Sequence, residues 1–429
     1  MNLDFYDAYI QILKEELVPA MGCTEPIAIA YAAAKGRELL DSLPDHCILS
    51  VSGNIIKNVK SVVVPNTGGR KGIEAAVAVG VVAGDPAAKL EVISGVTPER
   101  IPEIGAFLES HPVTVRLADT DETFLIDLTL FKAKHSARVV ISGRHTNIIL
   151  LEKDDAVVFH SEEVSEGDVL GADAGLTGRD ILNVRDIIDF AEFVRIEDIE
   201  PILSRQVAYN SAISQEGLRG EWGAQVGKTL MSQCDSTDIA VRAKAAAAAG
   251  SDARMGGCSL PVVIVSGSGN QGMAASLPVI EYADYLGKSR EELYRALTVS
   301  NLVTIHQKTG IGRLSAFCGA VSAGCGAAAG IVFLYGGRYK EIAHTVVNAL
   351  ATISGMTCDG AKPSCAAKIA AAVDAGIFGY KLYLNGHQFY AGDGIVSKGV
   401  DNTIGNVGRM AREGMRETDR EILRIMIGQ

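Results

Sequence analysis

The sequence predicts an α+β protein in which a large, mostly helical domain carries an α+β domain inserted after the first two helices. Three observations lead to this prediction. Two segments with helical periodicity open the chain, segments with strand-like alternation follow as far as residue 152, and helical periodicity dominates the rest of the 429 residues. We therefore divide the chain into N-terminal helices at 1–44, an α+β domain at 45–166 and a helical domain at 167–429.

A short loop separates the two N-terminal helices. Apolar residues recur at helical spacing over Tyr6–Leu17, and Pro19 ends this pattern. The loop at 20–26 reads Ala-Met-Gly-Cys-Thr-Glu-Pro and leads into a second helix at Ile27–Leu40, where Pro26 suits the first turn. We expect both helices to pack on the helical domain.

Short runs of alternating or β-branched residues predict the strands of the α+β domain. The predicted strands are Cys47–Ser52, Ser61–Val64, Val113–Ala118, Thr123–Lys132, Ser136–Ser142 and Asn147–Glu152. Two predicted helices, Gly72–Ala83 and Pro98–Ser110, lie between them. A unit built from these elements has the size of an ordinary domain.

Beyond residue 167 the chain is predicted to be mostly helical, with Gly-rich joints between the helices. The predicted helices are Ile181–Val194, Ile199–Ser214, Ile239–Ala249, Arg290–Leu302, His344–Leu350, Ala366–Phe378 and Thr403–Met415. The joints lie at 256–272, 310–330, 355–365 and 392–408. Because irregular segments on a rigid scaffold carry most function, we expect the chemistry to lie in these joints.

Charge and composition argue against several classes of function. The net charge of −11 offers no clustered positive charge for nucleic acid. The apolar stretch at 319–334 is rich in Gly and Ala and too weakly apolar for a membrane span, and the acidic N-terminal segment lacks the chemistry of a signal peptide. We expect a cytoplasmic protein, with homo-oligomerisation left open, whose eight cysteines are reduced and serve packing, catalysis or metal binding.

A glycine-rich loop at 266–272, Ser-Gly-Ser-Gly-Asn-Gln-Gly, follows the apolar run Val262–Val265. The pattern G-x-G-x-x-G after a strand is typical of dinucleotide sites. Such a site also needs a second parallel strand, whereas Ala274–Thr298 has helical periodicity throughout. A loop that holds a substrate carboxylate on backbone N–H groups fits better, with Ser268 and Asn270 as candidate substrate contacts.

Two further features are candidates for contacts in a site. Asn66 and Thr67 precede two glycines between an apolar run and a helix, a context in which backbone N–H groups can hold a carboxylate with help from Arg70. His306, close to Lys308, is a candidate acid or base. A histidine that is exposed or satisfied by a structural partner is the commoner case.

The cysteines do not form any familiar metal motif. They lie at 23, 47, 234, 258, 318, 325, 358 and 365, without a C-x-x-C pair. Zinc ribbons, thioredoxin-like redox sites and ferredoxin patterns therefore have no support. Since free cysteine is among the most buried residue types, we interpret Cys47, Cys234, Cys258 and Cys325 as packing residues.

Three cysteines are candidates for holding a metal cluster. Cys358 and Cys365 are seven residues apart across a loop with Gly and Pro, and Cys318 lies at a loop-to-helix junction. Three thiolates can hold three irons of a [4Fe-4S] cube and leave the fourth iron without a protein ligand. An open coordination position makes a metal a Lewis acid rather than an electron carrier. The spacing alone leaves this as one hypothesis among several.

The same segments resemble a known family. Residues 315–319 with 325–330, and 355–360 with Cys365, look like the cluster-binding segments of iron–sulfur L-serine dehydratases. The closer resemblance is to the L-cysteine desulfidase family, a relative of the dehydratase α chain, whose Gly-Cys-Thr-Glu-Pro motif and Ser-Gly-Ser-Gly-Asn-Gln-Gly loop both occur here. The resemblance covers nearly the whole chain.

Two departures from the dehydratases argue against serine as the main substrate. The loop from Cys358 to Cys365 is shorter than its dehydratase counterpart. The dehydratases' Ser-His-Thr-x-Gly-Pro segment is replaced by Gly-Cys-Thr-Glu-Pro at 22–26.

The resemblance implies that the helical domain is catalytic and holds a [4Fe-4S] cluster on Cys318, Cys358 and Cys365. It implies the removal of sulfide from L-cysteine by β-elimination, giving pyruvate and ammonia, with Cys23 as proton acceptor. A place just before a helix N-terminus predicts a lowered pKa for Cys23.

Thr24 and Glu25 share the motif of Cys23 and are candidate substrate contacts, Glu25 to the ammonium group. Two alternatives stay open. The first is an iron–sulfur L-serine or L-threonine dehydratase, and the second is a non-catalytic protein that binds a small molecule or a nucleotide.

Overall fold

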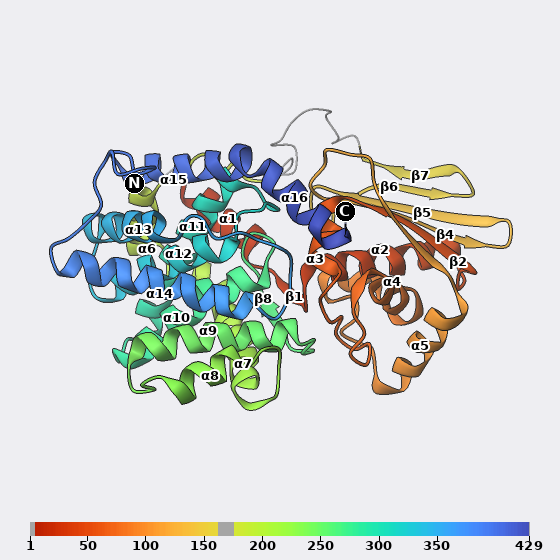
Figure 1. The fold of residues 1–429 in the computed structure, drawn as a ribbon, viewed down its shortest axis with the longest axis horizontal. Helices are drawn as coiled ribbons and strands as arrows, with labels where there is room; N and C mark the ends of the chain where they lie inside the picture. The colour runs from red at the N-terminus through yellow and green to blue at the C-terminus, as the bar shows by residue number, and fades with distance from the viewer. Residues whose placement is uncertain (1–4, 162–175, 429) are drawn as a thin grey trace.

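The computed structural model describes residues 5–161 and 176–428 as a helical lobe beside an α+β lobe (Figure 1). This arrangement confirms the predicted α+β class. The helices of the helical lobe are α1 (Tyr6–Glu16), α6 (Val184–Phe193), α7 (Ile196–Arg219), α8 (Val226–Gln233), α9 (Ile239–Met255), α10 (Gly269–Tyr285), α11 (Arg290–Ile311), α12 (Gly319–Leu334), α13 (Tyr339–Ile353), α14 (Cys365–Leu384) and α15 (Val400–Arg409). A short π-helical segment (Met410–Gly414) then leads into the last helix, α16 (Arg416–Ile427).

A mixed sheet forms the α+β lobe. Within the fully described range 46–160 its strand order is β3-β2-β4-β5-β6-β7, and only β2 and β3 run parallel. The strands are β2 (His46–Val51), β3 (Val113–Leu117), β4 (Leu125–Lys132), β5 (His135–Ser142), β6 (Ile148–Lys153) and β7 (Ala156–His160). Alternate residues such as Leu49 and Leu128, which are register partners, are buried and form the core face. The last strand, β7, was not predicted.

Two apolar helices pack on this core face. They are α2 (Thr24–Leu40) and α4 (Gly72–Ala83), while α5 (Ile101–Ser110) packs against α4. We expected α2 to pack on the helical lobe, as α1 does, and α2 departs from that expectation. The reason is that α2 is buried around nearly its whole circumference, because it is enclosed between the sheet and α4.

One predicted strand and one predicted joint differ from the structure. The predicted strand Ser61–Val64 is wrong, because α3 (Gly53–Val59) precedes it and Val63 alone forms an isolated bridge, to Lys71. Val62 and Val64 are instead buried in a loop. The joint predicted at 310–330 is helical from residue 319 onward, as α12. Small residues there permit close helix contact, since a Cβ on Gly324 would lie 2.5 Å from the carbonyl oxygen of Ala372.

Two connections join the lobes near their common boundary. Strand β1 (Pro19–Met21), between α1 and α2, pairs antiparallel with β8 (Pro261–Val263) of the helical lobe. The C-terminal helix α16 crosses to the α+β lobe and packs on α3 (Figure 1). There the buried amine of Lys57 lies 2.5 Å from Asp419 Oδ1, and Asn54 donates to Asp419 Oδ2 at 2.9 Å. The pairing of β1 with β8 was not predicted.

The glycine-rich loop after β8 does not belong to a dinucleotide-binding fold. The partner of β8 is the antiparallel strand β1, and α10 and α11 follow without an intervening strand. The parallel neighbour that a dinucleotide site requires is thus missing in this part of the described chain. The helices of the described residues also fall short, in length or in apolar character, of what crossing a bilayer requires.

We predict that Gly80→Ala destabilises the protein. A Cβ at this position in α4 would lie 2.2 Å from the carbonyl oxygen of Ala30 in α2. Overpacking of this kind costs about 1–3 kcal/mol, which outweighs the gain of about 1 kcal/mol in helix propensity. The matched control is Gly405→Ala in α15, where no atom lies within 4 Å of the added Cβ, and which should be neutral or stabilising. Urea unfolding of both variants checks this, and equal effects would contradict it.

Candidate active site

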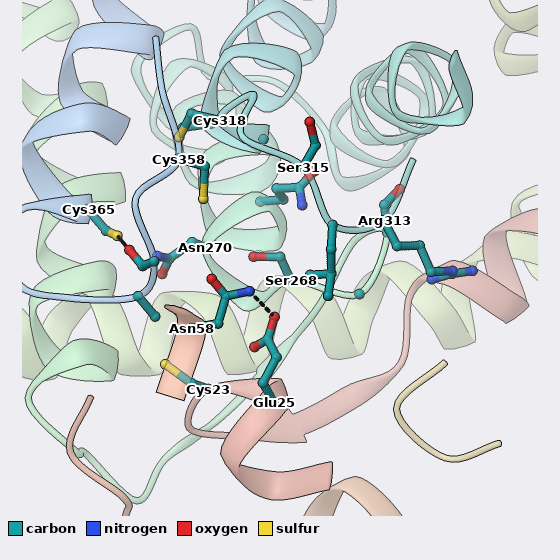
Figure 2. Close-up of a pocket in the computed structure, with 18 of the residues that line it drawn as sticks. Cys23, Glu25, Asn58, Ser268, Asn270, Arg313, Ser315, Cys318, Cys358 and Cys365 are labelled. Carbon is teal, nitrogen blue, oxygen red and sulfur yellow. Dashed lines mark hydrogen bonds between the residues drawn. The ribbon is translucent and has the colours of Figure 1, made fainter. Parts of the chain in front are cut away.

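A pocket at the boundary of the two lobes brings most of the predicted site residues together (Figure 2). Segments of both lobes line it: the starts of α2, α10, α12 and α14, the ends of α3, α9 and α11, and the loops around residues 145, 313 and 360. The predicted residues that line it are Cys23, Glu25, Ser268, Asn270, Cys318, Cys358 and Cys365. These residues come from segments more than 300 positions apart, so only the fold brings them together.

Four helices begin at this pocket. Cys23, Ser268 and Cys318 are the N-cap residues of α2, α10 and α12, and Cys365 is the first residue of α14. None of these four described helix starts has a side-chain cap. The first N–H groups of a helix lack intrahelical partners and carry partial positive charge, so the pocket favours anionic ligands.

Cys318 and Cys358 are placed side by side by a short backbone ladder. Phe317 and Thr357 form an isolated antiparallel bridge, the N–H of Cys318 donates to Met356 O at 3.0 Å, and the N–H of Cys358 donates to Ala316 O at 2.6 Å. Both cysteines are therefore on the same face of the ladder, as a diagonal pair whose Cα atoms are typically roughly 7–8 Å apart. Their sulfur atoms lie on one side of the pocket (Figure 2).

Cys365 lies on the same side of the pocket, at the end of the loop that begins at Cys358 (Figure 2). This loop is pressed against α3. Gly360 has φ +92, and a Cβ on it would lie 2.1 Å from the carbonyl oxygen of Lys57. Only glycine fits there, so α3 fixes the course of the loop and the position of Cys365.

The wall that carries the three cysteines is flanked by lysines; Cys318 is buried, and Cys358 and Cys365 are partly buried. Burial, followed by the charge of Cys358, raises the pKa of Cys318 to about 12, and burial also raises the pKa of Cys365. Lys308 is buried beside them, and burial lowers its pKa to about 8 although Cys358 and Cys318 act in the opposite direction. Lys368 donates to Thr357 O at 2.8 Å. Positive charge is therefore available to offset thiolates on this wall.

Cys23 is buried beside Met255, whose sulfur lies 3.9 Å from the cysteine sulfur. The sequence predicted a lowered pKa for Cys23, and this is wrong: burial raises its pKa to about 12, although the positive charge of Arg254 acts to lower it. The side chain is only 1% exposed, so the loss of hydration of the thiolate outweighs the helix N-terminus. Near pH 7 Cys23 is thus a neutral thiol.

Glu25 supplies a negative charge in the pocket. Asn58 donates to its Oε1 at 3.1 Å (Figure 2), and Thr24 Oγ1 lies 3.1 Å from its Oε2. Burial would raise the pKa of Glu25, but His145, 4.0 Å from Oε1, and Arg254 outweigh it and lower the pKa. Glu25 is therefore ionised at neutral pH.

The glycine-rich loop before α10 is a tight turn. Val265 and Ser268 exchange backbone hydrogen bonds of 3.1 Å, and the residues between them, Ser266 and Gly267, have φ of 48 and 80. Thr24 Oγ1 donates to Gly267 O at 2.8 Å, which ties the start of α2 to this turn. Thr24 thus supports the pocket without lining it, while Ser268 and Asn270 line it.

Three sequence candidates lie elsewhere. Asn66 donates to Ile93 O at 3.0 Å and Thr67 to Val64 O at 2.7 Å, so both serve their own turn and neither lines the pocket. His306 Nε2 lies 2.9 Å from Asp401 Oδ1, a structural pairing outside the pocket. We leave these residues out of the site.

Sequence reasoning missed several pocket residues. They include Asn58, His145, Arg254, Lys308 and Arg313. Arg254 and Lys308 lie within helical patterns that gave no sign of a pocket, and Lys308 was noted only as a neighbour of His306. Gln271, which its place in the glycine-rich motif made a plausible polar contact, does line the pocket.

No group of three His, Cys, Asp or Glu side chains in residues 5–161 and 176–428 converges closely enough for a single metal ion. A cluster differs, because its ligands surround a cube of several atoms and lie further apart than the ligands of one ion. The three cysteines of the pocket are candidates for such a cluster.

The model of the serine dehydratase alpha chain family matches residues 87–424. The chain belongs to the serine dehydratase alpha chain family. Full-length relatives include UPF0597 proteins of Desulfitobacterium hafniense, 56% identical over 99% of this chain and 97% of the relative, and of Treponema denticola, 46% identical over 100% of both. Membership in this family points to a dehydratase or lyase and associates the chain with iron–sulfur enzymes. The narrower resemblance to L-cysteine desulfidases stays a prediction.

We predict that a thiol-alkylating reagent near neutral pH modifies Cys234 long before Cys23. Cys234 is exposed, which contradicts the packing role expected for it. Cys23 is buried with a pKa of about 12, so little of its thiolate is present or accessible. Peptide mass spectrometry after timed iodoacetamide treatment measures both rates, with the urea-unfolded chain as the control in which both react. Equal rates in the folded protein would contradict the burial of Cys23.

Proposed function

We propose that this family member is a [4Fe-4S]-dependent lyase that removes sulfide from L-cysteine by β-elimination, giving pyruvate and ammonia. The observation that carries the proposal is the pairing of Cys318 and Cys358 on one face of a ladder, with Cys365 beside them, in a pocket where four helices begin. Cys23 reaches the same pocket from α2.

The donor set suits such a cluster. Three cysteine sulfurs from one wall would hold three irons, and the buried lysine Lys308 would offset the negative charge of the thiolates. When bound, the cluster supplies one iron without a protein ligand, a Lewis acid for the substrate's carboxylate or leaving thiolate. Cys325, which is 1% exposed within α12 and does not line the pocket, is left out of the ligand set.

The chain's own residues would bind and orient the amino acid. The N–H groups at the start of α10, next to Ser268, attract the carboxylate through the partial positive charge of the helix N-terminus. Glu25, ionised and held by Asn58, attracts the ammonium group. Thr24 keeps Glu25 close to the turn before α10. A zwitterion bound in this way would present its Cα–H inside the pocket that Cys23 lines.

Cys23 is the proposed proton acceptor. Cys23 must first lose its own proton to solvent, which a pKa of about 12 disfavours near pH 7 and the positive charge of Arg254 favours. The thiolate, once formed, is basic enough to take the weakly acidic Cα–H. As the Cα–H bond breaks, its electron pair forms the Cα=Cβ bond while the Cβ–S bond breaks and its pair leaves as sulfide. The resulting 2-aminoacrylate tautomerises to an imine, which water hydrolyses to pyruvate and ammonia.

A second candidate is the elimination of water from L-serine. The family description favours it, since the matching model is that of a serine dehydratase alpha chain. The same residues would serve, but hydroxide is a poorer leaving group than a thiolate. The Gly-Cys-Thr-Glu-Pro segment at 22–26, which is the feature of the resemblance to desulfidases, favours cysteine.

We predict that anaerobically prepared protein releases sulfide and pyruvate in equal amounts from L-cysteine, with a higher kcat/KM than for L-serine or L-threonine. Parallel assays of sulfide and pyruvate on the three amino acids measure this. A higher kcat/KM for L-serine would contradict the proposal and support the elimination of water from L-serine instead. If protein that carries the cluster turns over none of the three amino acids, the result would contradict the lyase proposal and support a non-catalytic binding protein.

We predict that Cys23→Ala retains the visible absorbance of the cluster and loses turnover by a factor of about 10² to 10⁴, the range for removal of a general base. Cys325→Ala is the matched control, since Cys325 is equally buried and lies outside the pocket. This control should keep both absorbance and turnover. Loss of iron from Cys23→Ala would instead make Cys23 a ligand.

A further inference from the structure

Arg254, the penultimate residue of α9, is a buried arginine without an acidic partner. It lines the pocket with an exposed fraction of 3%. Arg179, which is the other buried arginine of the described chain, pairs with Glu15 and Glu16, each at 2.8 Å. No carboxylate in residues 5–161 or 176–428 forms an ion pair with Arg254. The carboxylate of Glu25 interacts with Arg254 through its charge but forms no ion pair with it. A buried cation without a direct ion-pair partner is costly, so an anion from outside would complete the site.

The guanidinium of Arg254 is held in place on two sides. Its Nε donates to the carbonyl oxygen of Gly22 at 2.8 Å, directly before Cys23. On the other side it lies against the first residue of α10, where a Cβ on Gly269 would come within 2.5 Å of Nε and 2.9 Å of Cζ. The Nε is thereby anchored, and the two terminal nitrogens have no hydrogen-bond partner within the described chain.

Two buried acceptors without partners accompany these free donors. The side-chain oxygens of Asn270 and Gln271, on the first turn of α10, are buried and have no hydrogen-bond donor among the described residues. Both residues line the same pocket as Arg254. Free donors on a cation and unsatisfied neutral acceptors beside it are complementary to a zwitterion, with its carboxylate on the arginine next to the start of α10 and its ammonium group between Glu25 and the amide oxygens.

We propose that Arg254 binds the substrate carboxylate through its terminal nitrogens, and that it thereby restricts the enzyme to amino acids with a free α-carboxylate. The inference rests on the proposed function and names the residue that selects the substrate class. An arginine can grip a carboxylate with two parallel hydrogen bonds, which fixes the orientation of the ligand as well as its charge. Since Gly22 anchors Arg254 beside Cys23, a carboxylate bound there places Cα close to the proposed proton acceptor.

The test compares L-alanine, an amino acid without a leaving group, with L-alaninamide, which lacks the carboxylate. Binding of each to the anaerobic holoenzyme is measured by calorimetry, so the readout does not depend on turnover. The wild type should prefer L-alanine. Arg254→Gln should weaken L-alanine binding about 30-fold or more, the effect of removing one partner of a buried charge pair, and should abolish the preference. Arg254→Lys should recover part of it.

Two further variants separate recognition from folding. Gly269→Ala leaves Arg254 in the chain but forces its guanidinium to move, and should reproduce the loss of preference in a protein that still melts cooperatively. Arg242→Gln is the control, because Arg242 lies on the same helix and pairs at 2.9 Å with Glu281 away from the pocket. This control should bind L-alanine like the wild type.

Folded Arg254→Gln and Gly269→Ala proteins that bind L-alanine as tightly as the wild type, and still prefer it to the amide, would overturn the inference. Release of sulfide from L-cysteine by the wild type would then leave the proposed function standing. Conversely, Arg254-dependent binding of L-alanine without turnover of L-cysteine would support the carboxylate site and count against the lyase.

Discussion

The convergence of four helix N-termini on one pocket is the constraint on which the site depends. The starts of α2, α10, α12 and α14 lack side-chain caps, so their N–H groups and partial positive charges face a buried space. Arg254 and Lys308 add two buried cations, against which Glu25 supplies a buried carboxylate. Such a pocket is costly when empty and becomes favourable when anions fill it, whether thiolates with a metal cluster or the carboxylate of a substrate.

The two lobes must be held in a fixed position relative to each other for this convergence to occur. The pairing of β1 with β8 sets the start of α2 beside the turn before α10, and Thr24 closes the contact through Gly267. From the other side, α3 is held by Asp419 of α16 through Lys57, whose amine also lies 3.4 Å from Ser315 O. Because Gly360 rests on the backbone of Lys57, the loop with Cys358 and Cys365 depends on the same contacts. A C-terminal helix remote in sequence thus supports the pocket.

Local patterns in the sequence were enough for most helices and for five of the six strands of the large sheet, because periodicity is a property of neighbouring residues. The cysteine wall could also be proposed, since Gly-rich segments around Cys318 and Cys358 are visible locally. Arg254 and Lys308 could not, because each lies in an ordinary helical pattern and gains its meaning from distant partners. The prediction placed α2 against the helical lobe, whereas it packs in the α+β lobe. The sequence could not decide this, because a helix that is apolar on all sides can pack in either lobe. The pKa of Cys23 was misjudged because a sequence does not reveal how completely a loop thiol is buried.

The measurement that tests the central claim most directly is the iron and acid-labile sulfide content of protein purified without oxygen. The account predicts about four of each per chain, as a cube requires, and their loss when Cys318, Cys358 or Cys365 is replaced by serine. Cys325→Ser, buried in α12 and outside the pocket, should retain them. Wild-type protein that holds no iron after anaerobic reconstitution, or serine variants with unchanged iron content, would contradict it.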